Sequence, residues 1–261
     1  MSKAMSGFVC SLALCAGLVL AAGCASEKTK PAPQPAAQHP APAAPPPVEK
    51  AEAKVALPAG VAQPPARFEG TGWQAMFDGE SLNGWRDTPF AGHGEVHCQA
   101  GVIVLGIGDP FTGINWTNEF PKLNYEVALD AMRLAGSDFF CGLTVPVGTN
   151  FCSLIVGGWG GSLVGISSLD GMDASENETT KFSSFETGRW YRIRLRVTEK
   201  KIQAWIDQEK LVDVDTEGKR ISVRPGDIEL SEPFGVAAWE ASSALREIKF
   251  RRVGAPAGKG E

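Results

Sequence analysis

Residues 190–197 have the sequence WYRIRLRV, in which apolar side chains alternate with arginines. The apolar members are Tyr191, Ile193, Leu195 and Val197, and the basic members are Arg192, Arg194 and Arg196. Because successive side chains of a β-strand point to opposite faces, the two sets lie on opposite sides of an extended chain. This stretch therefore predicts a half-buried antiparallel strand whose outer face carries arginines paired with neighbouring strands.

Short strand-like segments continue along the chain, separated by glycine, proline and asparagine. The segments lie at 96–98, 102–105, 125–134, 202–206, 211–214, 234–239 and 244–252, and a further hairpin is expected to turn near 147–150. No long segment places apolar residues at helical spacing. We therefore expect an all-β fold in which two antiparallel sheets pack face to face.

The composition separates a folded domain from the segments around it. All seven Trp, both Tyr and twelve of the thirteen Phe lie from Phe68 onward, whereas residues 31–65 hold eleven of the eighteen Pro and no aromatic residue. This predicts one domain at 67–254, long enough to bury a core, followed by a flexible tail at 255–261. The net charge of -5 argues against nucleic acid as a partner, since nucleic-acid binding requires basic clusters.

Residues 1–23 have the features of a bacterial export signal. Lys3 precedes an apolar run at 7–22 that is short for a membrane span. Residues 20–24 are LAAGC, which resembles a lipobox, so we expect cleavage before Cys24 and lipidation of that residue. An ordinary signal peptide with a chance cysteine is the alternative. By resemblance to Gram-negative lipoproteins, Ala25 implies an outer-membrane lipoprotein facing the periplasm or the cell surface.

Residues 24–66 form the second predicted segment, a disordered Ala/Pro-rich linker that holds the domain away from the membrane. Beyond Cys24, the exported chain has three cysteines, at Cys98, Cys141 and Cys152. They allow one disulfide, of which Cys141 with Cys152 is one option, or none.

Residues 72–85, GWQAMFDGESLNGW, resemble the opening of the bacterial 3-keto-disaccharide hydrolase domain family, formerly a domain of unknown function. Segments 188–193, 202–207, 234–239 and 245–250 also resemble the closing strands of that family. The resemblance implies a concanavalin A-like jelly-roll sandwich and a hydrolase acting on 3-keto-disaccharides or related glycosides. The sequence departs from the family pattern at 137–143 and 152–159, which line the concave face in relatives.

The implied chemistry defines which residues to look for. A 3-keto group acidifies the C2 proton of a glycoside, so a base can remove it and the C1 substituent can leave. Such a site needs a carboxylate or histidine as base, donors for the enolate oxygen and an acid for the leaving oxygen.

A polar loop at 167–180 is the main candidate for this site. It carries Asp170, Asp173, Glu176 and Glu178, four carboxylates that repel one another unless solvated, protonated or bound to a cation. A solvated surface loop is one interpretation. A calcium site formed by Asp170, Asp173 and Glu176 is a second. A catalytic or sugar-binding loop is the third, with Glu176 or Asp173 as base and Asn177 as a substrate ligand.

Other candidates lie outside that loop. Trp159, followed by two glycines, is a candidate stacking platform for a pyranose ring, and Trp116 is a second; a core position is the alternative for both. His97, two residues from Glu95, is a catalytic acid-base group, a metal ligand or a structural histidine. Arg194 either contacts substrate or belongs to a salt-bridged outer face.

Two hypotheses follow from the sequence. The first is an envelope enzyme acting on glycosides, and the second is a non-catalytic carbohydrate-binding or scaffolding lipoprotein with the same fold. Both predict a carbohydrate partner and a membrane anchor at Cys24, and the fold alone does not distinguish them.

Overall fold

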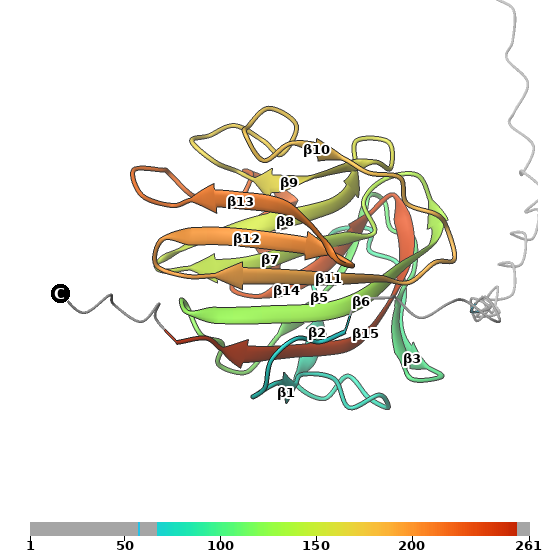
Figure 1. Ribbon diagram of the computed structural model, residues 1–261. Helices are drawn as coiled ribbons and strands as arrows, with labels where there is room; N and C mark the ends of the chain where they lie inside the picture. The colour runs from blue at the N-terminus through green and yellow to red at the C-terminus, as the bar shows by residue number, and fades with distance from the viewer. Residues whose placement is uncertain (1–56, 58–66, 255–261) are drawn as a thin grey trace, which may run out of the picture. The chain divides into compact units, whose positions relative to one another are not determined.

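The computed structural model describes Leu57 and residues 67–254, which form two stacked antiparallel sheets (Figure 1). The eight-stranded sheet contains β1 (Gln74–Ala75), β3 (Val96–Gln99), β4 (Val102–Leu105), β6 (Tyr125–Gly136), β11 (Tyr191–Val197), β12 (Lys201–Ile206), β13 (Glu209–Asp215) and β15 (Ala241–Arg252). The seven-stranded sheet contains β2 (Trp85–Asp87), β5 (Phe111–Trp116), β7 (Cys141–Val147), β8 (Asn150–Gly158), β9 (Leu163–Ser167), β10 (Lys181–Phe182) and β14 (Gly235–Trp239).

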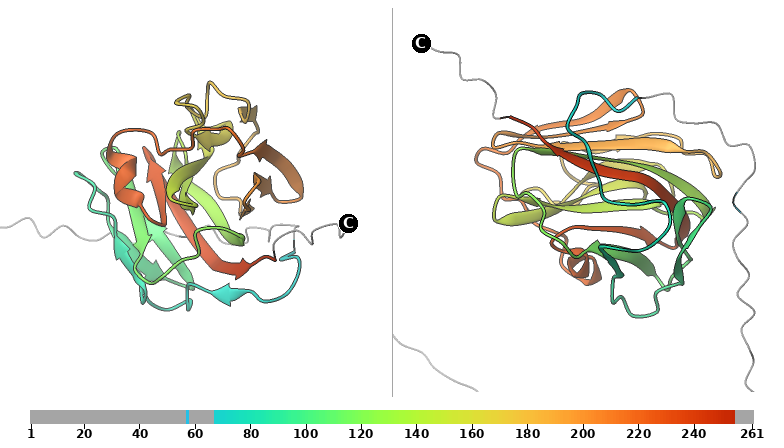
Figure 2. Two further views of the ribbon diagram at one scale, coloured as in Figure 1. Left: turned by 90° about the vertical axis from the view of Figure 1, so that its left-hand side faces the viewer. Right: turned by 90° about the horizontal axis from the view of Figure 1, so that it is seen from below.

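The strand order departs from the chain order, as in a jelly roll. The larger sheet runs β13-β12-β11-β6-β15-β4-β3, with β1 paired to β15, and the smaller runs β10-β9-β8-β7-β14-β5-β2. The one helical element in the described residues is the 3-10 helix η1 (Asp227–Ser231). It lies on the outer side of the seven-stranded sheet (Figure 2). The predicted all-β sandwich of two antiparallel sheets is confirmed.

The main core lies between the two sheets. Strand β11 buries Tyr191, Ile193, Leu195 and Val197 and turns its arginines outward, as its alternation predicts. The inner face of the other sheet contributes side chains such as Leu143 and Leu154, which have no exposed surface. Burial of apolar side chains from both layers drives the sheets together.

The predicted hairpin is present, because Val147 pairs with Asn150 across the turn between β7 and β8. Cys141 pairs with Val156, and Cys152 pairs with Val145, so the two cysteines occupy different rows of the sheet. Both thiols are free and buried in the core, and Cys98 is free as well. Burial raises the pKa of Cys141 and of Cys152 to about 12.

The outer face of the eight-stranded sheet carries a network of ion pairs. The carboxylates of Glu126 and Asp130 have no exposed surface and lie beneath the arginines of β11. Arg192 contacts Asp130 at 2.7 Å and Arg196 contacts Glu126 at 3.0 Å. The simpler interpretation of the arginines, a face paired with neighbouring strands, is confirmed.

The N-terminal strap (residues 67–73) covers part of this network. The carboxylate of Glu69 contacts Arg194 at 2.8 Å. The guanidinium carbon of Arg192 lies 3.6 Å from the centroid of the Phe68 ring. Trp73 packs in the same way under Arg251. The domain thus begins on the outer face of the eight-stranded sheet.

The export signal, the linker and the tail, including Cys24, lie outside the described residues. Within the described part of the chain, no helix has the length and apolar character needed to cross a membrane.

Candidate functional site

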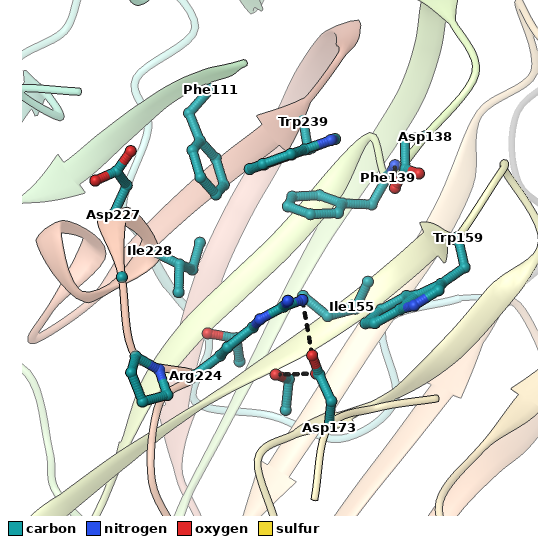
Figure 3. Close-up of a pocket in the computed structure, with 14 residues that line it drawn as sticks. Phe111, Asp138, Phe139, Ile155, Trp159, Asp173, Arg224, Asp227, Ile228 and Trp239 are labelled. Carbon is teal, nitrogen blue, oxygen red and sulfur yellow. Dashed lines mark hydrogen bonds and ion pairs between the residues drawn. The ribbon is translucent and has the colours of Figure 1, made fainter. Parts of the chain in front are cut away.

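A pocket opens on the outer face of the seven-stranded sheet, whereas the strap lies on the outer face of the eight-stranded sheet. Figure 3 shows the residues that line the pocket. Its volume of about 480 Å³ lies in the usual range for small-ligand sites. It is lined by Phe111, Asp138, Phe139, Ser153, Ile155, Trp159, Ser167, Asp173, Arg224, Pro225, Gly226, Asp227, Ile228 and Trp239. The strands supply the floor, and the loops after β9 and β13 supply the rim.

Aromatic rings form one wall of the pocket. The rings of Phe111 and Trp239 meet edge to face with centroids 4.5 Å apart, and Phe139 lies 6.1 Å from Phe111. Small residues in the underlying strands make room for these rings, because a Cβ at Gly142 would lie 2.8 Å from the ring of Phe139. The rings therefore lie close against the sheet and give the pocket an apolar surface.

A carboxylate and a guanidinium meet in the middle of the pocket (Figure 3). Oδ1 of Asp173 accepts hydrogen bonds from the Ser167 hydroxyl at 2.5 Å and from the Ala174 amide at 2.7 Å. Oδ2 of Asp173 lies 2.8 Å from Nη1 of Arg224. The side chain of Asp173 is 16% exposed, whereas that of Arg224 is 60% exposed. The carboxylate is therefore held firmly, and the cation is free to move.

Trp159 stands at the other end of the pocket, in the turn between β8 and β9. It is 43% exposed and has a φ of 49°, in the left-handed region that non-glycine residues rarely adopt. Asp138 supports the turn, since its Oδ2 accepts a hydrogen bond from the Gly160 amide at 3.0 Å. The pocket thus combines aromatic surfaces, carboxylates and one cation, the combination that recognises a sugar's apolar face and its hydroxyls.

Residues 72–253 match the family model described as the 3-keto-alpha-glucoside-1,2-lyase-like domain. The chain belongs to this family. The match spans the sandwich from the N-terminal strap to the end of β15, so the lyase-like domain and the folded domain coincide. The resemblance of residues 72–85 and of the closing strands is therefore confirmed.

Several solved structures are similar to the lyase-like domain. A candidate glycosyl hydrolase from Parabacteroides distasonis is 12% identical, with 70% of this chain and 94% of that chain covered and a TM-score of 0.45. The carbohydrate-binding module CBM66 from Bacillus subtilis is 12% identical, with 64% and 95% covered and a TM-score of 0.44. A protein of unknown function with a galectin-like fold from Bacillus subtilis is 10% identical, with 67% and 92% covered and a TM-score of 0.48. No curated protein sequence matches the chain.

Of the residues predicted from the sequence, Asp173 and Trp159 line the same pocket. Glu176 follows Asp173 by three residues but is exposed, outside the pocket lining. Asp170 is also exposed, and its carboxylate accepts a hydrogen bond from the Arg220 amide at 2.8 Å. Of the four carboxylates in this loop of the lyase-like domain, Asp173 alone lines the pocket.

The predicted calcium ligands are not brought together. The loop carboxylates face basic residues of the 216–226 segment: Asp173 faces Arg224, and Glu178 contacts Lys219. The described residues contain no group of three Asp, Glu, His or Cys side chains that could hold a metal ion. Lys219 and Arg224 thus form ion pairs with three of the four carboxylates of this loop.

Asn177 holds the loop in place and does not face the pocket. It is 7% exposed, and its Nδ2 donates to the carbonyls of Ile166 and Asp173, both at 2.7 Å. Its Oδ1 accepts from the amide and the hydroxyl of Thr179. Asn177 therefore fixes the backbone that presents Asp173, and its amide group is not available to a ligand.

Three other predicted residues lie elsewhere in the lyase-like domain. His97 is on β3 at the edge of the eight-stranded sheet, with Nδ1 3.2 Å from Glu95. Trp116 packs edge to face against Trp85, with centroids 5.1 Å apart. Arg194 belongs to the ion-pair network beneath the strap. None of the three lines the pocket.

Sequence reasoning missed Asp138, Arg224 and Asp227 as pocket residues. Asp138 lies in the 137–143 segment that departs from the family pattern, which was the available signal. Arg224 and Asp227 lie in the long connection between β13 and β14, and their types and spacing carry no motif.

Proposed function

We propose that this chain is an envelope-anchored enzyme that binds a 3-keto-glycoside in the pocket and eliminates its C1 substituent. The observation that carries the proposal is the ion pair of Asp173 and Arg224 inside an aromatic-walled pocket. In this proposal, Asp173 removes the C2 proton, and Arg224 stabilises the charge that develops on the C3 oxygen.

The geometry of the pair fits the geometry of the reaction. The C2–H and C3=O groups of the substrate are on adjacent carbons, so base and cation must be close neighbours. Oδ2 of Asp173 and Nη1 of Arg224 are 2.8 Å apart. A substrate carbonyl that accepts a hydrogen bond from Arg224 draws the guanidinium away from Asp173 and frees Oδ2 to take the proton.

The electrons of the broken C2–H bond form the enolate, which then expels the C1 oxygen and leaves a C1=C2 double bond. The departing oxygen takes a proton from water at the open rim of the pocket. Water then adds to the enone if the overall reaction is a hydrolysis.

The aromatic residues supply binding without chemistry. Trp159 offers a flat surface to the apolar face of a pyranose ring, and Phe111 with Trp239 closes the opposite end. Remote contacts of this kind provide the binding energy that orients the reacting atoms.

The proposed location rests on the N-terminal sequence alone. The lipobox-like segment LAAGC at 20–24 supports export, lipidation of Cys24 and attachment to the outer membrane. Mass spectrometry of the mature N-terminus tests this proposal, and we expect a diacylglyceryl group on Cys24. An unmodified Cys24, or a mature chain that begins at another residue, would contradict it.

A second function is favoured by a specific contact pattern. Both oxygens of Asp173 already have partners, so the carboxylate takes a proton from a substrate only after one of these contacts breaks. A pocket in which Asp173 orients sugar hydroxyls without turnover is therefore the alternative, a carbohydrate-binding lipoprotein on the same fold.

Turnover of methyl 3-keto-α-glucoside by the full-length chain distinguishes the two functions. We expect release of methanol, and we expect Asp173→Asn to lower kcat by roughly 10²- to 10⁴-fold, the usual contribution of a catalytic base. Glu176→Gln is the matched control, because Glu176 is an exposed carboxylate of the same loop.

The control variant should keep kcat within about twofold of the wild-type value. Binding without turnover by the wild-type chain would favour the carbohydrate-binding function. Turnover that survives Asp173→Asn unchanged would remove Asp173 as the base.

A further inference from the structure

Arg133 is an unusual residue for its position. It lies on β6 in the eight-stranded sheet, is 6% exposed, and has no carboxylate within ion-pair distance in the described part of the chain. Its Nε is buried without a hydrogen-bond partner. Burial lowers the pKa of its guanidinium, and the charge of Asp138 partly offsets that effect. A buried cation without a paired carboxylate is costly, so its retention requires an explanation.

The guanidinium is directed at the turn that carries Trp159. Nη2 of Arg133 donates to the carbonyl of Gly161 at 3.0 Å and to the carbonyl of Gly157 at 3.3 Å. Gly157, near the end of β8, and Gly161, in the turn after β8, flank Trp159 on either side. Arg133 therefore connects the two layers of the sandwich at the base of the pocket's stacking surface.

The turn is shaped to fit around this side chain. A Cβ on Gly157 would lie 2.6 Å from Nη2 of Arg133, and a Cβ on Gly161 would lie 3.2 Å from Nη1. Both glycines have positive φ, as does Trp159 itself. A left-handed tryptophan persists only when its surroundings impose the conformation.

A second contact acts from the pocket side. Asp138 accepts the Gly160 amide hydrogen bond at 3.0 Å, so the peptide groups on the two sides of the Gly160–Gly161 pair are held from opposite directions. The carbonyl of Gly161 is held from within the sandwich, and the amide of Gly160 is held from the surface. The turn has little freedom to rotate the indole away from the pocket.

We propose that Arg133 is a positioning residue that holds the Trp159 turn in the orientation required for sugar stacking. This inference rests on the proposed function in that it assigns the stacking role to Trp159. Arg133 itself contacts no ligand and acts only through the backbone of the turn.

The position of Trp159 is measured in the full-length chain labelled with 5-fluorotryptophan, using fluorine NMR without any ligand. The chain has seven tryptophans, and Trp159→Phe identifies the resonance of Trp159. In Arg133→Met, which keeps the length of the side chain but removes its donors, that resonance should move toward the position of a solvated tryptophan. Arg133→Lys should restore it in part, because an ammonium still donates to a carbonyl.

The same variants are then assayed with methyl 3-keto-α-glucoside. For Arg133→Met we expect KM to rise by up to about tenfold, the effect of losing the Trp159 surface, while kcat changes less than threefold. Arg192→Met is the matched control, because Arg192 is a half-buried arginine on the outer face of the same sheet, and this variant should leave the Trp159 resonance unchanged. If Arg133→Met does not fold, Arg133→Gln provides the second test, because it keeps a polar side chain at the buried position and withdraws the guanidinium from the two carbonyls.

An unchanged Trp159 resonance in Arg133→Met, or in Arg133→Gln if that variant replaces it, would overturn the inference. A displaced resonance with an unchanged KM would uphold the positioning role of Arg133 and count against stacking on Trp159. A chain whose wild-type form neither binds nor converts the glycoside would refute the proposed function, and the NMR result would still decide the role of Arg133.

Discussion

Replacing Trp159 with alanine should weaken sugar binding, and the exposed surface area of the indole sets the size of the loss. A tryptophan of about 250 Å² that is 43% exposed offers about 110 Å² to a ligand. A sugar ring stacked on one face covers roughly half of that area, which at about 25 cal/mol per Å² corresponds to about 1.4 kcal/mol. Because 1.4 kcal/mol is a factor of ten, we expect Kd to rise about 10-fold, and about 100-fold if the whole exposed surface is covered.

Isothermal titration calorimetry with methyl 3-keto-α-glucoside measures this change, in an Asp173→Asn background that prevents turnover. Phe182→Ala is the control, since Phe182 is an aromatic residue on β10 that is 72% exposed and does not line the pocket. Its Kd should stay within twofold of the background. The stacking role would be refuted if the Kd of Trp159→Ala stayed within twofold of the background value, or if Phe182→Ala raised Kd by the same factor as Trp159→Ala.

Three further predictions concern the framework around the pocket. Glu126→Gln should lower the free energy of unfolding by about 3–5 kcal/mol, because it removes the buried charge shared by three arginines; urea denaturation tests this, and a loss below about 1 kcal/mol contradicts it. Cys141 and Cys152 should resist iodoacetamide at pH 8 unless the chain is unfolded. Their pKa of about 12 lies above the ordinary 9.0, so the protonated folded form loses stability as pH rises from 9.0 toward 12. Asn177→Ala should cost about 1–3 kcal/mol and raise KM, and an unchanged urea midpoint would show that the amide does not hold the loop.

The sheets could be predicted where a strand has one buried face. In β11, the alternation of apolar residues and arginines is visible because one side faces the core and the other faces solvent. Strand β8 shows no such alternation, since Leu154 faces the core and its neighbour Ile155 packs under the pocket loops. Without alternation, the sequence does not reveal which of its side chains face a ligand.

The candidate site was predictable only in part, for a similar reason. The four carboxylates at 170–178 are equivalent by type and spacing, and hydrogen bonds from Ser167 and Ala174 select Asp173 for the pocket. Its partner Arg224 is distant in sequence and is brought close by the pairing of Leu169 with Ile221. Such long-range contacts leave no local pattern.

The N-terminal strap has a practical consequence for how the domain can be presented. Because the chain enters the sandwich on the outer face of the eight-stranded sheet, its point of attachment and the mouth of the pocket lie on opposite sides of the domain. A sensor chip, a bead or a fusion partner joined through the N-terminus is attached to the domain through the strap. The pocket, on the opposite face, stays open to solution. Immobilisation through that end should therefore preserve ligand access, whereas attachment through lysines near Arg224, such as Lys219, should obstruct it.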